Sequence, residues 1–303
     1  MEVAAGPGGA VYDVVVVGGA GVDTTVYVPG LPLPYADTYT VPPAVDRIGN
    51  TGSGVVLGCH ALGLRTILID LVGDDPQGAL VRGHLTARGI EFAFGTVPEG
   101  TRRSVLLVAP DGRRTSLFDP RHVPGRRLPR DLYLPAVRRA RHVHLSITDF
   151  SRHLFPDLHA LGVPTSTDLH DWDGENPYHR DFARHADIVF LSAARLTDPP
   201  ATMRDILAGG RATQVICTAG ASGAYLLTRT TPLVHRPAAV PKSPVVDTNG
   251  AGDAFASAYL YAHLHGLPAE RALHLATLAG AHACTTPGTH ENPVDERTLL
   301  AQE

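Results

Sequence analysis

Short apolar segments alternate with helical stretches over most of this 303-residue chain. The first segment, Asp13–Val17, reads DVVVV, a continuous apolar run typical of a strand buried on both faces. Similar strands are expected at 66–71, 141–145, 163–168, 187–191 and 214–218. Repeated strand–helix alternation is typical of a parallel sheet with helices on both sides. The sequence therefore predicts an α/β fold with a mostly parallel sheet.

Two extended segments, near 24–46 and 92–118, do not follow this alternation. Within the second, Pro110, Asp111 and Gly112 separate two short strands and predict a hairpin. We expect the two segments to form a small sheet that protrudes from the main body. The chain has no long linker, low-complexity run or internal repeat, so we expect residues 1–303 to form a single domain.

Composition argues against several classes of partner. The net charge of -4, with 44% hydrophobic and 18% charged residues, gives no support for a nucleic-acid or membrane partner. No apolar run approaches the roughly 18 residues that span a bilayer. The N-terminus lacks the basic region and apolar core of a secretory signal. Because Cys59, Cys217 and Cys284 are far apart and odd in number, we expect free thiols and a cytoplasmic protein.

Several nucleotide and catalytic motifs can be excluded. The only lysine, Lys242, has no glycine loop before it, so the chain has no P-loop, and a bound phosphate needs backbone amides, arginine and a metal. Gly19 and Gly21 follow a strand, but the third glycine of a dinucleotide fingerprint is missing, which argues against an oxidoreductase. The 16 histidines form no H-E-x-x-H zinc motif, and no serine lies in a nucleophile elbow.

The clearest chemical signal is the segment 247–255, which reads DTNGAGDAF. A flexible turn at Gly250, Ala251 and Gly252 opens into an apolar helical stretch, with Asp253 in its first turn. First-turn N–H groups lack intrahelical partners, so this turn suits a phosphate. A carboxylate there repels the phosphate, but it can accept a proton from a hydroxyl that attacks it. The motif favours phosphoryl transfer to an alcohol, although by itself it also fits a tight loop with an ordinary first-turn charge.

Three further motifs accompany this turn. Gly49-Asn50-Thr51-Gly52 leads to a Leu-Gly pair, Val72–Gly78 reads VGDDPQG, and Thr218-Ala219-Gly220 follows an expected strand. Together with 247–253, and in this order, they resemble the motifs of the ribokinase-like (PfkB-type) carbohydrate and nucleoside kinases. The resemblance extends from about residue 13 to residue 295.

The resemblance implies a Rossmann-like three-layer core and a β-sheet lid made from segments 24–46 and 92–118. It also implies that ATP binds near the C-terminal half and that the substrate lies between lid and core. Asp253 is then the catalytic base, and the amides of 250–253 form the anion hole for the transferring γ-phosphoryl group. Mg²⁺ is expected to bridge the β- and γ-phosphates.

The same resemblance assigns binding residues. Asp23 matches a position that hydrogen-bonds substrate hydroxyls, although an aspartate there also suits the capping of a turn. Other substrate contacts are expected from Gly49, Asn50, Thr51, Gly54 and Asp168, and nucleotide contacts from Thr218, Gly220, Gly223, Thr248, Asn249 and Thr277. The carbonyls around Asp247 and Gly288 match a site for a monovalent cation such as K⁺.

Three positions depart from the family's pattern. Gly54 stands where the family commonly has a substrate-binding asparagine, and glycine has no side chain to bond a hydroxyl. The N-x-x-E element that helps organise Mg²⁺ falls at Ser192–Arg195, where arginine reverses the charge. That arginine either contacts phosphate or lies at the surface. Asp168-Leu169-His170 stands where many relatives have a D-x-N pair, so the identity of the substrate that accepts the phosphoryl group stays open.

We therefore expect an ATP-dependent kinase that phosphorylates a primary hydroxyl of a small sugar. An adenosine-type nucleoside kinase is the first alternative, because aromatic residues of the expected lid, such as Tyr27 and Phe118, could stack on a base. A catalytically weakened regulator that binds sugar or nucleotide is the second, motivated by the departures at Gly54 and Arg195. The retained Asp253 argues against the regulator. Related lids often pair across a homodimer, which is an analogy only.

Overall fold

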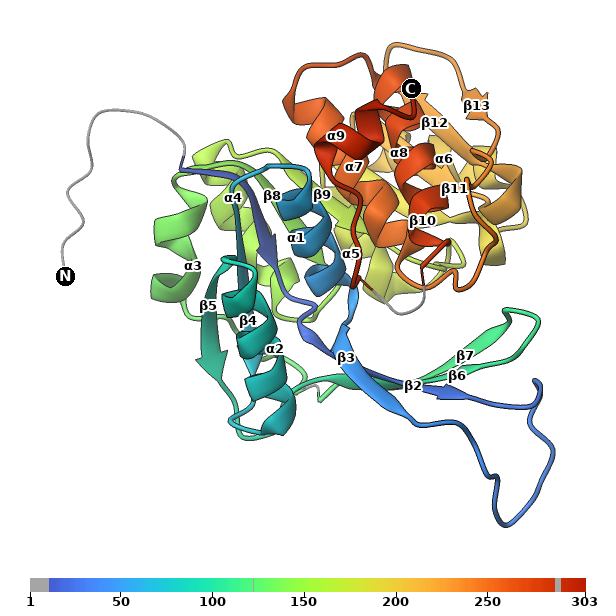
Figure 1. Cartoon of the computed structure of the whole chain (residues 1–303). Coiled ribbons are helices and arrows are strands. Elements are labelled where there is room, and N and C mark those ends of the chain that lie inside the picture. Colours follow the sequence, from blue (N-terminus) through green and yellow to red (C-terminus); the bar gives the residue numbers. More distant parts are fainter. Residues whose placement is uncertain (1–10, 122, 287–289) are drawn as a thin grey trace.

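A nine-stranded sheet runs through the centre of the molecule, and a four-stranded sheet projects from it (Figure 1). The structure is a computed structural model that describes residues 11–121, 123–286 and 290–303. The strand order in the large sheet is β13-β12-β11-β10-β9-β8-β1-β4-β5. Its strands are β1 (Tyr12–Val17), β4 (Thr66–Val72), β5 (Glu91–Thr96), β8 (Ala140–Ser146), β9 (Thr165–Asp168), β10 (Ile188–Ser192), β11 (Gln214–Thr218), β12 (Ala224–Thr228) and β13 (Val234–Arg236).

The large sheet is parallel except at one edge, where β12 pairs antiparallel with both of its neighbours. Successive residues of its strands point to opposite faces, so each face packs its own layer of helices. One layer contains α1 (Thr51–Ala61), α2 (Pro76–Ala87), α7 (Ala251–Leu264), α8 (Ala269–Ala283) and α9 (Glu296–Leu300). The other contains α3 (Arg130–Val137), α4 (Phe155–Leu161), α5 (Pro177–His185) and α6 (Pro199–Gly209). The expected three-layer α/β core is confirmed.

The small sheet has the order β3-β2-β6-β7, formed by β2 (Gly21–Tyr27), β3 (Val45–Gly49), β6 (Arg103–Val108) and β7 (Arg114–Asp119). The expected hairpin around residues 110–112 joins β6 to β7. The start of the second lid segment at residue 92 was wrong. Residues 91–96 form β5 at the edge of the large sheet, because Phe92 and Phe94 pack against the core while the strand pairs with β4.

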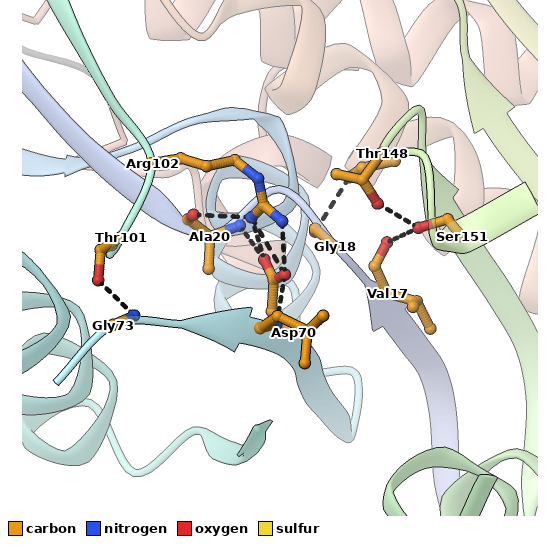
Figure 2. A network of polar contacts seen from close by, with 11 residues as sticks. Val17, Gly18, Ala20, Asp70, Gly73, Thr101, Arg102, Thr148 and Ser151 are labelled. Carbon is orange, nitrogen blue, oxygen red and sulfur yellow. Dashed lines mark hydrogen bonds and ion pairs between the residues drawn. The ribbon is translucent and has the colours of Figure 1, made fainter. Parts of the chain in front are cut away.

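A buried ion pair anchors the two places where the chain passes from the large sheet into the small one. Asp70 of β4 is fully buried, and its Oδ2 accepts a hydrogen bond from the backbone N–H of Ala20 at 2.6 Å. The same carboxylate pairs with Arg102, whose Nη1 lies 2.9 Å from Oδ2 (Figure 2). Ala20 precedes β2 and Arg102 precedes β6. One carboxylate of the core therefore holds both places where the chain enters the small sheet.

Candidate active site

Asp253 lies in the first turn of α7, where the sequence predicts a helix start. Gly250 precedes the helix with φ 74°, a left-handed conformation that glycine adopts without strain. The helix then continues through an apolar stretch that packs against α1 and α8. This packing leaves Asp253 only 8% exposed.

The backbone amides around Asp253 are available to an anion. Among the described residues, the N–H groups of Gly250, Gly252 and Asp253 have no hydrogen-bond acceptor. A Cβ atom added at Gly252 would meet open space within 4 Å. Gly250 also lines a depression that is open to solvent. The start of α7 thus has the free donors and the space that a phosphate requires.

The Asp253 carboxyl group holds its proton more tightly than an ordinary aspartate. Burial raises its pKa well above the usual value, and the nearby carboxylates of Asp168 and Asp23 raise it further. Arg114 opposes these effects. A carboxylate with a raised pKa is a stronger proton acceptor, which suits a general base.

Asp23 sits on β2, facing the start of α1. Asn50 Nδ2 donates to Asp23 Oδ1 at 3.3 Å, and the Asn50 side chain does not cap α1. Gly49 is required beside it, because an added Cβ would lie 2.2 Å from Asp23 Cγ. Burial raises the pKa of Asp23, against hydrogen bonds from the Ser104 hydroxyl and the Asn50 backbone. Asp23 is therefore a buried carboxylate between the small sheet and α1.

The expected glycine loop packs the start of α1 against the turn after β1. An added Cβ at Gly52 would lie 1.8 Å from the Gly18 carbonyl oxygen. The N–H of Ser53 donates to the Gly19 carbonyl at 3.1 Å. Thr51 is the first residue of α1 and is partly buried. This close backbone contact holds Asp23 and α1 in a fixed relation.

Asp168 ends β9 at the carboxyl edge of the large sheet, where ligands of open α/β sheets usually bind. Its Oδ1 accepts a hydrogen bond from the N–H of His170 at 2.8 Å. Its charge raises the pKa of Asp253, which places it in the electrostatic neighbourhood of that residue.

The residues expected to bind nucleotide occupy two places. Thr218 ends β11, and Gly220 and Gly223 follow it with φ values of 55° and 97°. Gly223 is also required sterically, since an added Cβ would lie 2.0 Å from the Arg236 carbonyl oxygen.

The remaining nucleotide candidates lie near α7 and on α8. Thr248 is exposed, whereas Asn249 is buried and its N–H donates to Asp247 Oδ1 at 2.9 Å. Thr277 lies on α8, and its hydroxyl donates to the His274 carbonyl at 2.7 Å.

Of the two residues expected at a metal site, the structure describes one. Gly288 lies outside the described residues, while Asp247 is buried. Arg195 is 59% exposed and faces Asp171 and Asp173, so it lies at the surface, as one of our two readings had it. Across the described ranges, no group of three or more His, Cys, Asp or Glu side chains is placed to hold a metal ion.

Sequence reasoning missed Arg114. This residue belongs to β7 of the small sheet, and its Nη1 donates a hydrogen bond to Asn249 Oδ1 in the glycine turn of the core. The arginine lowers the pKa of both Asp23 and Asp253. Nothing in the sequence singled it out among 26 basic residues, because the contact joins positions 135 residues apart.

His290 was also missed. Its Nε2 lies 3.4 Å from Asp253 Oδ2, and its side chain is 5% exposed. Burial lowers the pKa of His290 to about 3, so the imidazole is neutral. It occupies the space above Gly54, the position where the sequence departs from the family's asparagine.

Comparisons with known proteins bear on this geometry. Residues 162–297 match the pfkB family carbohydrate kinase. The acarbose 7(IV)-phosphotransferase of Actinoplanes sp. is 50% identical over 290 residues, which cover 95% of this chain and 97% of that protein. The solved structure of a microbiome-derived acarbose kinase has a TM-score of 0.90 at 46% identity, covering 96% of this chain and 98% of that one. Ribokinase of Arabidopsis thaliana, solved with ribose and ATP, shares the fold with a TM-score of 0.81, at 21% identity and coverage of 96% and 98%.

These similarities favour the sugar-kinase expectation over the nucleoside-kinase and regulator alternatives. No helix in the part of the chain that the structure describes is long and apolar enough to cross a bilayer. The chain belongs to the pfkB family of carbohydrate kinases and is an ATP-dependent sugar kinase.

Proposed function

We propose that this kinase transfers the γ-phosphoryl group of ATP to a primary hydroxyl of its sugar, with Asp253 as the general base. The hydroxyl oxygen forms a bond to the γ-phosphorus as its proton passes to the Asp253 carboxylate. The bond from the γ-phosphorus to the β,γ-bridging oxygen breaks, and ADP leaves with its electron pair. The products are a sugar phosphate, ADP and a proton that Asp253 releases to solvent.

The observation that carries this proposal is a buried carboxylate beside three amides that lack acceptors among the described residues. Amides aimed at developing charge typically contribute roughly 3–4 kcal/mol each to transition-state binding. Asp23, a second buried carboxylate, accepts hydrogen bonds from sugar hydroxyls. The small sheet acts as the lid that covers the sugar and excludes water, which would otherwise hydrolyse ATP.

ATP binds between Gly250–Asp253 and the Thr218–Gly223 turn, with Thr248, Asn249 and Thr277 on the same side. Mg²⁺ supplied with the nucleotide would neutralise charge on the β- and γ-phosphates, since this ion usually keeps waters and binds through substrate phosphates. Asp247 contributes to a K⁺ site near the glycine turn. Omitting K⁺ from an otherwise complete assay should lower turnover if that site exists, and unchanged turnover contradicts it.

The acceptor that we propose is acarbose or a closely similar oligosaccharide. Two relatives at 50% and 46% identity are named for acarbose phosphorylation, and both align over nearly the whole chain. Gly54 supports an acceptor unlike a simple ribose, because it removes the side chain that the family commonly uses for a substrate hydroxyl.

The test is ADP release with acarbose, ribose, fructose and adenosine, each at matched concentration. We expect the largest kcat/KM with acarbose. The phosphorylated product should show phosphorus coupling to a CH₂ carbon in its NMR spectrum, as a primary ester requires. Turnover of adenosine alone, or phosphorus coupled only to CH carbons, contradicts the proposal.

We further propose a cytoplasmic homodimer, with the small sheet as the interface. Leu117 and Phe118 of β7 are 56% and 55% exposed, which leaves apolar surface on the projecting sheet. Light scattering after size-exclusion chromatography should give twice the 32.1 kDa chain mass. Replacement of both residues by serine should then yield the monomer, and a monomeric wild type contradicts this proposal.

A further inference from the structure

Three segments that are far apart in the sequence meet at the Asp253 side chain. Asp253 comes from α7, Gly54 from α1, and His290 from the segment between α8 and α9. His290 Nε2 lies 3.4 Å from Asp253 Oδ2, and both side chains are almost fully buried. The imidazole therefore faces the carboxylate in a place that water hardly reaches.

Gly54 is what allows these two side chains to meet. A Cβ added at Gly54 would lie 2.3 Å from His290 Cε1 and 2.7 Å from Asp253 Oδ2. Real Cβ atoms do not approach other atoms this closely, so any side chain at position 54 has to displace the imidazole or the carboxylate. The position of the His290 imidazole beside Asp253 thus requires that residue 54 has no side chain.

A general base needs a carboxylate oxygen aimed at the hydroxyl that it deprotonates. The terminal torsion of aspartate is broad and roughly two-fold, so packing of Cβ alone does not fix the direction of the oxygens. His290 Nε2 lies 3.4 Å from Oδ2, and donation from its N–H to this oxygen would fix that torsion. Oδ1 would then remain free to accept the proton of the hydroxyl.

We propose that His290 is a positioning residue that orients the Asp253 carboxylate for proton transfer, and that Gly54 is bare in order to admit it. This inference rests on the proposed role of Asp253 as the base. His290 contacts the base and not the acceptor, so its loss affects turnover more than binding. A residue that merely fills space would instead affect the stability of the fold.

The experiment compares His290→Ala with His290→Gln, whose amide can still donate to Asp253. His290→Ala should lower kcat roughly 10- to 100-fold, as misplacement of a catalytic group does, with KM for ATP and sugar within about two-fold. His290→Gln should recover a large part of that loss. The matched control is His60→Ala. It removes an imidazole from the last turn of α1 and should leave kcat unchanged. Thermal unfolding of every variant verifies that it folds.

A double-mutant cycle with Asp253→Asn separates positioning from other effects. If His290 acts only through Asp253, His290→Ala should change the residual turnover of Asp253→Asn by less than about two-fold. An equal loss in both backgrounds, or a glutamine variant no better than alanine, overturns the inference and leaves the base in place. Wild-type turnover of Asp253→Asn overturns the proposed base and this inference together.

Discussion

The two sheets of this kinase differ in how they are stabilised. In the large sheet, β4 is buried along its whole length and each face packs against a layer of helices. In the small sheet, β7 is exposed at every position except the last, which is half-buried. The large sheet is stabilised by apolar burial, which is non-directional. The outer part of the small sheet instead contacts the core through individual polar pairs.

Three such pairs are prominent. Arg102 pairs with Asp70 where the small sheet begins, and Arg47 of β3 pairs with Glu291 at 2.7 Å. Arg114 of β7 reaches Asn249 in the glycine turn. The outer part of the sheet, attached in this way, can move without disturbing the hydrophobic core, as the proposed lid must. The comparison therefore predicts that changes in the core pairings affect stability, whereas changes at the distal contacts affect catalysis.

The largest expected effect is on catalysis, at the start of α7. Asp253→Asn should lower kcat roughly 10²- to 10⁴-fold, which is the usual contribution of a general base. The free energy of unfolding should not fall, because an amide is less costly to bury than a carboxylate. Steady-state ADP release and thermal unfolding measure the two quantities. Asp205→Asn on exposed α6 surface is the control, and turnover near wild type in Asp253→Asn contradicts the prediction.

The same residue sets the pH dependence of activity. Only the deprotonated carboxylate accepts a proton, so kcat/KM should rise with pH through the raised pKa of Asp253, above the ordinary value of 3.8. The free energy of unfolding should change with pH in the opposite direction to activity. Because the pKa of Asp253 is raised in the folded state, its contribution to stability is full below 3.8 and is lost as the pH rises through the raised folded-state pKa. An acid limit of activity near 3.8 contradicts this assignment.

The next effect is on stability, at the connection between the sheets. Arg102→Ala leaves Asp70 buried without its charged partner and should lower the free energy of unfolding by about 3–5 kcal/mol. Arg113→Ala is the matched control, because its ion pair with Asp111 has side chains 64% and 52% exposed. Exposed pairs contribute about 0–1 kcal/mol. Equal losses in urea unfolding would show that the buried pair is no special anchor.

A smaller effect is expected at the distal contact. Arg114→Ala should lower kcat/KM roughly 10- to 100-fold, the usual range for hydrogen bonds that involve a charged group. It should also move the acid limit of activity to higher pH, because Arg114 lowers the pKa of Asp23 and Asp253. Arg114→Lys keeps the charge and should restore the pH limit more fully than the rate. Loss of stability without loss of rate contradicts the prediction.

The smallest effect is expected at Asp75, which joins α2 to the small sheet. Burial raises the pKa of Asp75, but hydrogen bonds from Thr101 and from the Gly78 N–H outweigh it and lower the pKa. Asp75→Ala should cost about 1 kcal/mol, as removal of an N-cap side chain usually does. Because the folded-state pKa is lowered, this contribution is present above 3.8 and is lost as pH falls through the lowered value. If the variant's loss in the free energy of unfolding is the same at low pH as at neutral pH, the ionised Asp75 carboxylate is not its source.

Local patterns in the sequence located most elements. The expected strand 214–218 coincides with β11. Asp75, from the Asp-Pro pair at the start of α2, caps that helix and accepts the Gly78 N–H at 2.7 Å. These features depend on neighbours in the sequence, such as an apolar run or an Asp-Pro pair. The placement of residues 92–96 was wrong because an extended segment can pair with either sheet, and only the packing of its aromatic residues decides which.

For the candidate site, the glycine turn and Asp253 were predictable because a glycine turn, a helix start and a carboxylate lie within seven residues. Arg114 and His290 were not. Each is one of many similar residues, and each acquires its place from a contact between distant segments.

By itself, the sequence determined the α/β order, the glycine turn before α7 and the carboxylate beside it, because short-range periodicity and backbone conformation encode them. Only the tertiary structure decided why Gly54 has no side chain, which basic residue reaches the turn, and which imidazole meets Asp253. Those answers depend on residues of remote segments that approach within a few ångströms across the fold, and close packing between such segments leaves no local pattern in a sequence.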